Sequence, residues 1–172
     1  MIADTLRVTS LAELDALVGH HVTQEKPEVY WEDTHGYFQF HSEFEARRAL
    51  NDPYFQRFLP HIDWSALQIR EVRVYRCYSV DPTANWILVE KAVGKFGAML
   101  VWREVGRWHA AFGSKPDAEA RTATIAICLA ALRAAGVPFE LDHNRIDSQL
   151  AQYESGPPGS VPIRPPRRFP TG

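Results

Sequence analysis

The order of apolar and polar residues predicts a short amphipathic helix near the start of the chain. Ser10 and Glu13 have the spacing of a capping box, in which each side chain satisfies a backbone N–H at the start of a helix. Gly19 is expected to end this helix in the left-handed conformation that glycine adopts readily. The apolar residues recur at helical spacing and share one face: Leu11, Leu14, Leu17 and Val18.

Residues 28–51 contain the patterns of a hairpin and of a second helix. Residues 28–40 have two aromatic-rich arms around the polar sequence DTHG, which predicts a small hairpin. Residues 42–51 follow as a helix, and Pro53 ends or redirects it because proline cannot donate into the helical ladder. The residues expected to point inward from this helix are Phe44, Ala46 and Leu50.

The middle of the chain has the pattern of several strands. Residues 69–80 mix charged with apolar residues, which favours a strand at the edge of a sheet. Residues 86–89 and 98–102 are continuous apolar runs, typical of strands covered on both faces, and the GKFG sequence between them predicts a hairpin. Residues 104–107 are expected to form a turn into a further strand, 108–112.

The least polar stretch, residues 118–135, predicts a long buried helix. Ser114 is its expected N-cap, and Gly136 and Pro138 end it. The uninterrupted apolar run in this region, residues 122–132 between Arg121 and Arg133, is far shorter than the roughly 20 residues that a membrane-spanning helix needs. Since its apolar residues cover more than one stripe, we expect it to form a wall of the core. Helices before and after a covered sheet predict an α/β (α+β) fold, a three-layer α/β/α sandwich with a mainly antiparallel sheet.

Changes in composition divide the chain into three parts. Residues 1–138 are expected to form the sandwich domain, with an insertion at about 51–67 that contains only short helical turns. Residues 139–153 are polar, with few apolar anchors, and predict a helical or irregular extension. Residues 154–172 form a tail rich in proline and arginine.

Composition and charge narrow the classes of function. A chain of 172 residues with 45% hydrophobic residues and a net charge of -2 is not typical of a general nucleic-acid-binding protein. Cys77 and Cys128 lie in apolar runs and are expected to be reduced, buried thiols. The seven histidines have no recognised metal-ligand spacing, and the common nucleotide, phosphate and nucleophile motifs are absent from the sequence. The sequence therefore predicts no catalytic residue, metal or cofactor.

Cationic and aromatic side chains give the main positive indication of a binding site. Arginine suits phosphate and aromatic rings suit bases, so a face that carries both could hold an anion or a nucleotide. Alternatively, Arg73 and Arg76 only pair across strands with Glu71, Glu90 or Glu104. The candidate residues are Arg47, Arg48, Arg70, Arg73, Tyr75, Arg76, Arg103 and Arg107.

The tail allows three interpretations. It could dock on a partner or on nucleic acid, it could be disordered, or its positive charge could fold back on the more acidic remainder of the chain. The candidate contact residues are Arg164, Arg167 and Arg168.

Two segments carry a resemblance to a known family. The sequence ELDALVG from Glu13, and the sequence ATIAICLAALRAAGV from Ala123 that follows WHAAF, together resemble the phage "ABA sandwich" domain family. The resemblance covers about residues 8–138 and implies α/β/α layering. Its motifs are structural, so it transfers no catalytic residue. The stretch 51–67 and the part after Pro138 depart from the family pattern.

The resemblance implies a phage- or prophage-encoded accessory protein of the bacterial cytoplasm. Our first hypothesis is a non-enzymatic protein that binds a host component, as an anti-defence inhibitor or a sponge for a nucleotide-like signal. The alternatives are a small enzyme acting on a phosphorylated or nucleotide ligand, and a virion assembly or structural factor. The expected partner is a host protein or a nucleotide-like small molecule. Nucleic acid and membrane are not expected, and homo-oligomerisation is left open.

Overall fold

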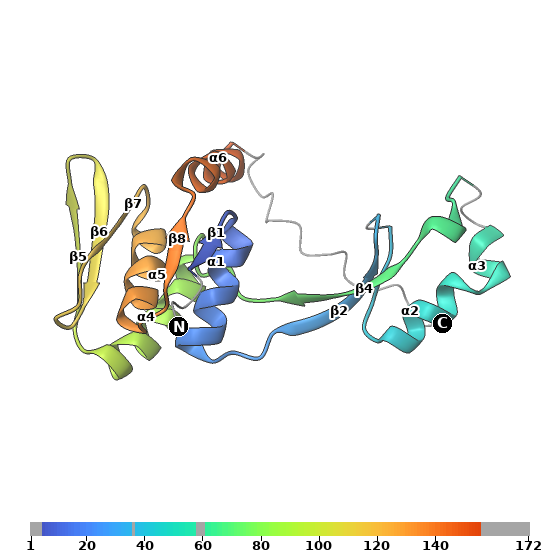
Figure 1. The fold of residues 1–172 in the computed structure, drawn as a ribbon, viewed down its shortest axis with the longest axis horizontal. Helices are drawn as coiled ribbons and strands as arrows, with labels where there is room; N and C mark the ends of the chain where they lie inside the picture. The colour runs from blue at the N-terminus through green and yellow to red at the C-terminus, as the bar shows by residue number, and fades with distance from the viewer. Residues whose placement is uncertain (1–4, 36, 58–60, 156–172) are drawn as a thin grey trace. The chain divides into compact units, whose positions relative to one another are not determined.

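The computed structural model describes residues 5–35, 37–57 and 61–155, which form two compact units (Figure 1). The first unit combines residues 5–26 with residues 75–155, and the second lies within residues 27–74. The segment 51–67, expected as an insertion, belongs to the second unit. The tail, with Arg164, Arg167 and Arg168, lies outside the described residues.

The second unit is built on an antiparallel sheet in the order β3-β2-β4. Its turn is held by Asp33, whose buried carboxylate accepts hydrogen bonds from the backbone N–H groups of His35 and Phe38 at 2.9 and 2.6 Å. The predicted hairpin is confirmed, as are the short helical turns and the edge position of the mixed strand, although this strand ends at Val74 and not at Val80. The elements are β2 (Glu28–Asp33), β3 (Gln39–Phe40), α2 (Glu43–Leu50), α3 (Pro53–Arg57), the 3-10 turn η2 (Trp64–Ala66) and β4 (Ile69–Val74).

Helix α2 confirms the second predicted helix and corrects one of its inward residues. Ser42 caps it by accepting from the backbone N–H of Glu45. Ala46 is buried and Leu50 half-buried, but Phe44 is 74% exposed. The prediction for Phe44 was wrong because residues two apart on a helix lie on nearly opposite faces, whereas residues four apart share one.

The first unit begins with β1 (Leu6–Val8), α1 (Leu11–Val18) and a π-helical turn, η1 (Gly19–Thr23). The predicted capping box is present. Gly19, however, does not end the helix: its φ is −56°, and Gln24 is the left-handed residue, with a φ of 54°. The structure gives another reason for the glycine. A Cβ at position 19 would lie 2.2 Å from Cδ1 of Tyr75.

The predicted strand 86–89 and the first three residues of the predicted GKFG hairpin lie in one helix, α4 (Pro82–Phe96), which Gly97 follows. Asp81 caps this helix by accepting from the backbone N–H of Thr83 at 2.8 Å, and Pro82 occupies the first turn, where its missing N–H costs nothing. Trp86 is exposed, whereas the buried residues recur at helical spacing: Ala84, Leu88 and Ala92. The apolar run is therefore helical.

The main sheet of the first unit is antiparallel, in the order β5-β6-β7. Its strands are β5 (Met99–Glu104), β6 (Arg107–Phe112) and β7 (Ala118–Ala120). The predicted turn between β5 and β6 is confirmed, with positive φ at Val105 and Gly106. The expectation that residues 98–102 are covered on both faces was wrong, because Leu100 is 63% exposed.

Helix α5 (Ala123–Ala134) packs against β6 and β7 and confirms the predicted core wall (Figure 1). It is shorter than predicted, and its N-cap is Thr122 rather than Ser114. The difference arises because Ala118 and Ala120 pair with β6, which places the first part of the expected helix in strand β7. Gly136, with a φ of 73°, follows the helix as predicted.

The predicted extension 139–153 is an ordered part of the first unit. Strand β8 (Phe139–Leu141) pairs in parallel with β1, and α6 (His143–Glu154) follows it. Ile146 and Leu150 of α6 are buried in the core. Gln149 fixes the start of α1 by accepting from the backbone N–H of Leu11 at 3.0 Å.

These elements form a mixed α+β fold whose strands pair mainly antiparallel, as predicted, with β1-β8 as the parallel pair among the described residues. The three-layer arrangement is not confirmed. Helix α5 covers one face of the β5-β6-β7 sheet, and on the other face Trp102 stacks on His109 with ring centroids 5.2 Å apart. No helix among the described residues is long and apolar enough to cross a membrane.

Candidate ligand-binding cleft

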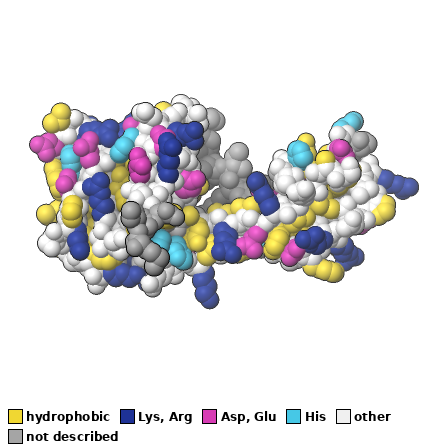
Figure 2. Space-filling view, viewed as in Figure 1, with side chains coloured by type: hydrophobic (Ala, Val, Ile, Leu, Met, Phe, Trp, Pro, Cys, Tyr) yellow, Lys and Arg dark blue, Asp and Glu magenta, His cyan; other side chains and the backbone are white. Residues whose placement is uncertain are grey.

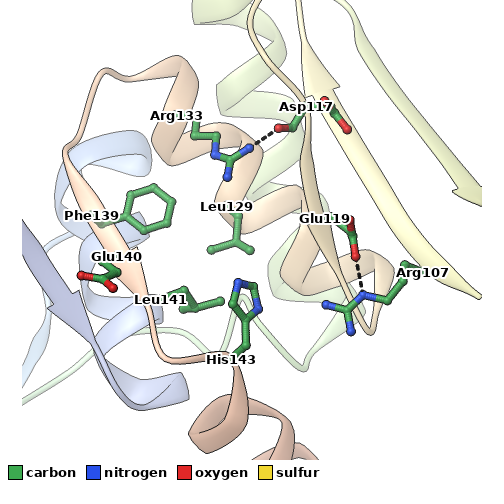
Figure 3. Close-up of a pocket in the computed structure, with 9 residues that line it drawn as sticks. All are labelled: Arg107, Asp117, Glu119, Leu129, Arg133, Phe139, Glu140, Leu141 and His143. Atoms are coloured by element: carbon green, nitrogen blue, oxygen red, sulfur yellow. Dashed lines mark hydrogen bonds and ion pairs between the residues drawn. The ribbon is translucent and has the colours of Figure 1, made fainter.

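A cleft of about 660 Å³ lies in the first unit, bordered by β7, β8, α5 and the start of α6 (Figure 3). This volume is typical of ligand sites, which span roughly 300–1,000 Å³. β7 is the end strand of the β5-β6-β7 sheet, and β8 belongs to the β1-β8 sheet. The cleft therefore lies between strands of two different sheets, which α5 connects along the chain.

Side chains of α5 and β8 form the apolar part of the cleft. Leu129 of α5 borders it, and Figure 3 shows Phe139 and Leu141 of β8 directed towards this leucine. Arg133 lies one helical turn beyond Leu129 and donates to the main-chain oxygen of Asp117. The apolar part therefore has a polar group at one end.

Charged groups on the β7 side are paired with one another. Arg107 donates to Glu119 at 2.6 Å, and the imidazole of His109 lies 3.0 Å from the carboxylate of Asp117. Both pairs link β6 to β7 or to the residue before β7. The charge of Arg107 is therefore paired with that of Glu119 before any ligand arrives.

The β8 side carries two polar residues of a different kind. Glu140 and His143 border the cleft, and neither side chain makes a hydrogen bond or ion pair within the part of the chain that the structure describes. Glu140 is exposed, and Figure 3 shows its carboxylate pointing away from Leu129. These two side chains are available to a ligand at the rim.

The candidate arginines predicted from the sequence do not gather at this cleft. Of that set, only Arg107 borders it. Arg47, Arg48, Arg70 and Arg73 belong to the second unit, and Tyr75, Arg76, Arg103 and Arg107 to the first. Figure 2 shows cationic side chains interspersed with acidic ones on the visible face. The ion pairs formed by the predicted residues are Arg47–Glu43, Arg70–Glu32, Arg73–Glu71, Arg76–Glu25 and Arg107–Glu119.

The remaining predicted residues have local roles. The ring of Tyr75 packs on Gly19, and the guanidinium carbon of Arg103 lies 5.9 Å from the ring centroid of Trp108. The alternative predicted pairs across strands, but the Arg73–Glu71 pair lies within β4, and Arg76 pairs with Glu25, which is not in a strand.

A buried polar cluster lies deeper in the first unit and was missed at the sequence level. Asp15 of α1 accepts from the backbone N–H of Ser79 at 2.8 Å, and burial raises the pKa of its carboxyl to about 7. Asn85 of α4 donates to the main-chain oxygens of Tyr78 and Thr124. The Ser79 hydroxyl is buried without a hydrogen-bond partner in the described part of the chain.

The thiol of Cys128 is not activated. Cys128 is buried as predicted, and burial raises the pKa of its thiol well above the usual range, so the thiolate is disfavoured. Cys77 is half-buried rather than buried. Within residues 5–35, 37–57 and 61–155, no group of three or more His, Cys, Asp or Glu side chains could hold a metal ion.

The cleft residues other than Arg107 were not predicted from the sequence. They are Asp117, Glu119, Leu129, Arg133, Phe139, Glu140, Leu141 and His143. They come from separate elements, and each belongs to a residue type that is common on any protein surface or core. Comparisons with protein-family models, curated proteins and solved structures found no match.

Proposed function

We propose that this protein is a non-enzymatic binding protein and that its ligand occupies the cleft between β7 and β8. The observation that carries the proposal is the combination of an apolar part, formed by Leu129, Phe139 and Leu141, with a rim of mixed charge. Apolar groups of a ligand site contribute buried area and its polar groups orient the ligand, and in this cleft six polar or charged residues accompany three apolar ones.

The distribution of charge favours a polypeptide over a nucleotide-like ligand. Two arginines and three carboxylates border the cleft, and Arg107 is already paired with Glu119. A phosphate group would need Arg107 to leave this partner and would lie among like charges. A polypeptide presents both donors and acceptors and can carry cationic side chains, so it matches the mixed rim.

The biological setting of the proposal comes from the family resemblance. It suggests a phage or prophage protein of the bacterial cytoplasm whose ligand is a host protein, as for an anti-defence inhibitor. The three-layer sandwich belongs to the same proposal. Trp102 and Leu100 leave one face of the β5-β6-β7 sheet partly apolar, and a bound partner or second copy there would add the third layer.

A pull-down with matched charge swaps tests this function. The cleft variant is Arg133→Glu with Glu140→Lys, and the control is Glu90→Lys with Lys91→Glu on the exposed surface of α4. Each swap leaves the net charge unchanged. Tagged proteins are expressed in the bacterial host, cross-linked and recovered, and bound proteins and released small molecules are identified by mass spectrometry.

We expect the wild-type protein and the control to capture the same host protein, and the cleft variant to lose it while its circular dichroism spectrum is unchanged. Equal capture by all three proteins would place the binding surface elsewhere. Release of a nucleotide from the wild-type protein, and not from the cleft variant, would favour the nucleotide-like ligand instead.

A further inference from the structure

The two strands that border the cleft each have an edge without a strand partner among the described residues. β7 is the last strand of the order β5-β6-β7, and β8 pairs only with β1. All three consecutive residues of β8 border the cleft. Because successive side chains of a strand point to opposite faces, this is expected only if the edge of β8, with its main-chain groups, faces the cleft.

Unpaired strand edges present backbone N–H and C=O groups that can pair with another chain. We infer that the cleft binds one extended segment of a partner polypeptide, which adds a strand between β7 and β8. This inference rests on the proposed function and specifies its ligand. With three residues in each strand, the contact would span about 10 Å of extended chain.

The burial pattern of the two strands predicts the side chains of the bound segment. In β7, Ala118 and Ala120 are buried and Glu119 is exposed. In β8, Phe139 and Leu141 are half-buried, and Glu140 is exposed. A strand inserted between them would point alternate residues towards Leu129 of α5, where apolar side chains fit. The other residues would lie beside Glu119 and Glu140, where cationic side chains fit.

The structure therefore assigns to the cleft a bound segment in which apolar and basic residues alternate. The C-terminal tail of this chain is also basic, but its sequence has prolines at positions 157, 158, 162, 165, 166 and 170. Proline cannot donate into a strand ladder, and the three-residue runs between these prolines, 159–161 (GSV) and 167–169 (RRF), do not alternate apolar with basic residues. The segment is therefore assigned to a partner protein.

A labelled peptide, Gly-Lys-Val-Lys-Val-Lys-Val-Gly, tests this inference by fluorescence anisotropy with the full-length protein. We expect saturable binding that weakens about tenfold or more when the backbone amides of the three valines, or of the three lysines, are N-methylated, because one set must face each strand edge. Glu140→Lys should weaken binding about fivefold or more, whereas Glu90→Lys should change it less than about twofold.

Hydrogen exchange identifies where the peptide pairs. Bound peptide should slow amide exchange in residues 118–120 and 139–141, because the free edges of both strands gain partners. Protection confined to other elements would overturn the inference, as would equal binding of all N-methylated peptides or no saturable binding at millimolar concentrations. Removal of residues 156–172 should leave the affinity within about twofold. A rise of tenfold would show that the tail is the occupant and would overturn the assignment to a partner.

The two proposals fail in different ways. If the cleft charge swap abolishes capture of the host protein but N-methylation has no effect on peptide binding, strand addition is wrong and the proposed function stands. If capture does not depend on the cleft, the proposed function is wrong whatever the peptide does.

Discussion

Replacing Asp15 by asparagine is expected to remove a pH-dependent part of the free energy of unfolding of the first unit. Asp15 is buried in α1, with the Ser79 backbone N–H as its hydrogen-bond donor and Cys128 of α5 nearby. Burial raises the pKa of the Asp15 carboxyl from 3.8 to about 7, against the opposing effect of the Ser79 hydrogen bond. The thiol of Cys128 stays neutral because its pKa is also raised.

The sign of the effect follows from proton binding. A carboxyl group with a higher pKa in the folded state than in the unfolded state binds its proton more tightly when folded. Its contribution to stability is complete below about pH 4 and is lost as the pH rises through about 7. These two pKa values correspond to a loss of about 2–3 kcal/mol in the free energy of unfolding between about pH 5 and about pH 8.

Asp15→Asn isolates this contribution because asparagine keeps an acceptor for the Ser79 N–H and carries no charge. Its amide group also offers a donor to the Ser79 hydroxyl, which lacks a partner in the described part of the chain. We expect the variant to match the wild-type protein only below about pH 4, where the carboxyl group is neutral in both states, and to gain about 2–3 kcal/mol relative to it between pH 5 and pH 8.

Urea unfolding followed by tryptophan fluorescence measures the difference. Trp31 and Trp64 are replaced by phenylalanine in both proteins, so that the fluorescence reports on the first unit only. Histidines and surface carboxylates titrate in both proteins and cancel in the comparison. Parallel stability profiles for the two proteins across this pH range would refute the assignment of a raised pKa to Asp15.

Three further predictions concern the core of the first unit. Leu132→Ala should lower the free energy of unfolding by about 2–5 kcal/mol, measured by urea unfolding, because Leu132 is fully buried in α5. Cys128 should react slowly with a thiol reagent in the native protein and rapidly in urea, and fast native labelling would contradict its burial. Gly19→Ala should cost about 1–3 kcal/mol through the contact with Tyr75, and Tyr75→Ala should relieve most of this cost in the double variant.

The elements that were predicted correctly are those with complete local patterns. The capping box of Ser10 and Glu13 lies within one helical turn, and the turn before Arg107 has its own sequence pattern, so neither depends on distant residues. Helix α4 was missed although its pattern is also local. The continuous apolar run 86–89 was interpreted as a strand, whereas Asp81 and Pro82 are typical of a helix start.

Strand β7 could not be predicted in this way. Ala118, Glu119 and Ala120 are residues that favour helices, and only their pairing with β6 makes them a strand. The same holds for the buried carboxylate of Asp15, which lies in an otherwise ordinary amphipathic helix and meets Ser79 only through tertiary packing. Tertiary contacts override local preference in both cases.

The cleft also depends on tertiary contacts that override the local preference of the sequence, and this links the fold to the proposed function. Helix α5 is apolar on nearly all sides, so each part of its surface needs cover from another element. The strand β7 covers it on one side, and β8 borders it beyond the cleft, at Leu129. Had residues 118–122 continued the helix, β7 would not exist, and its edge could not face that of β8. The short strand at Ala118–Ala120 therefore creates the feature on which the binding proposal rests, and variants that extend the helix into it should abolish the cleft.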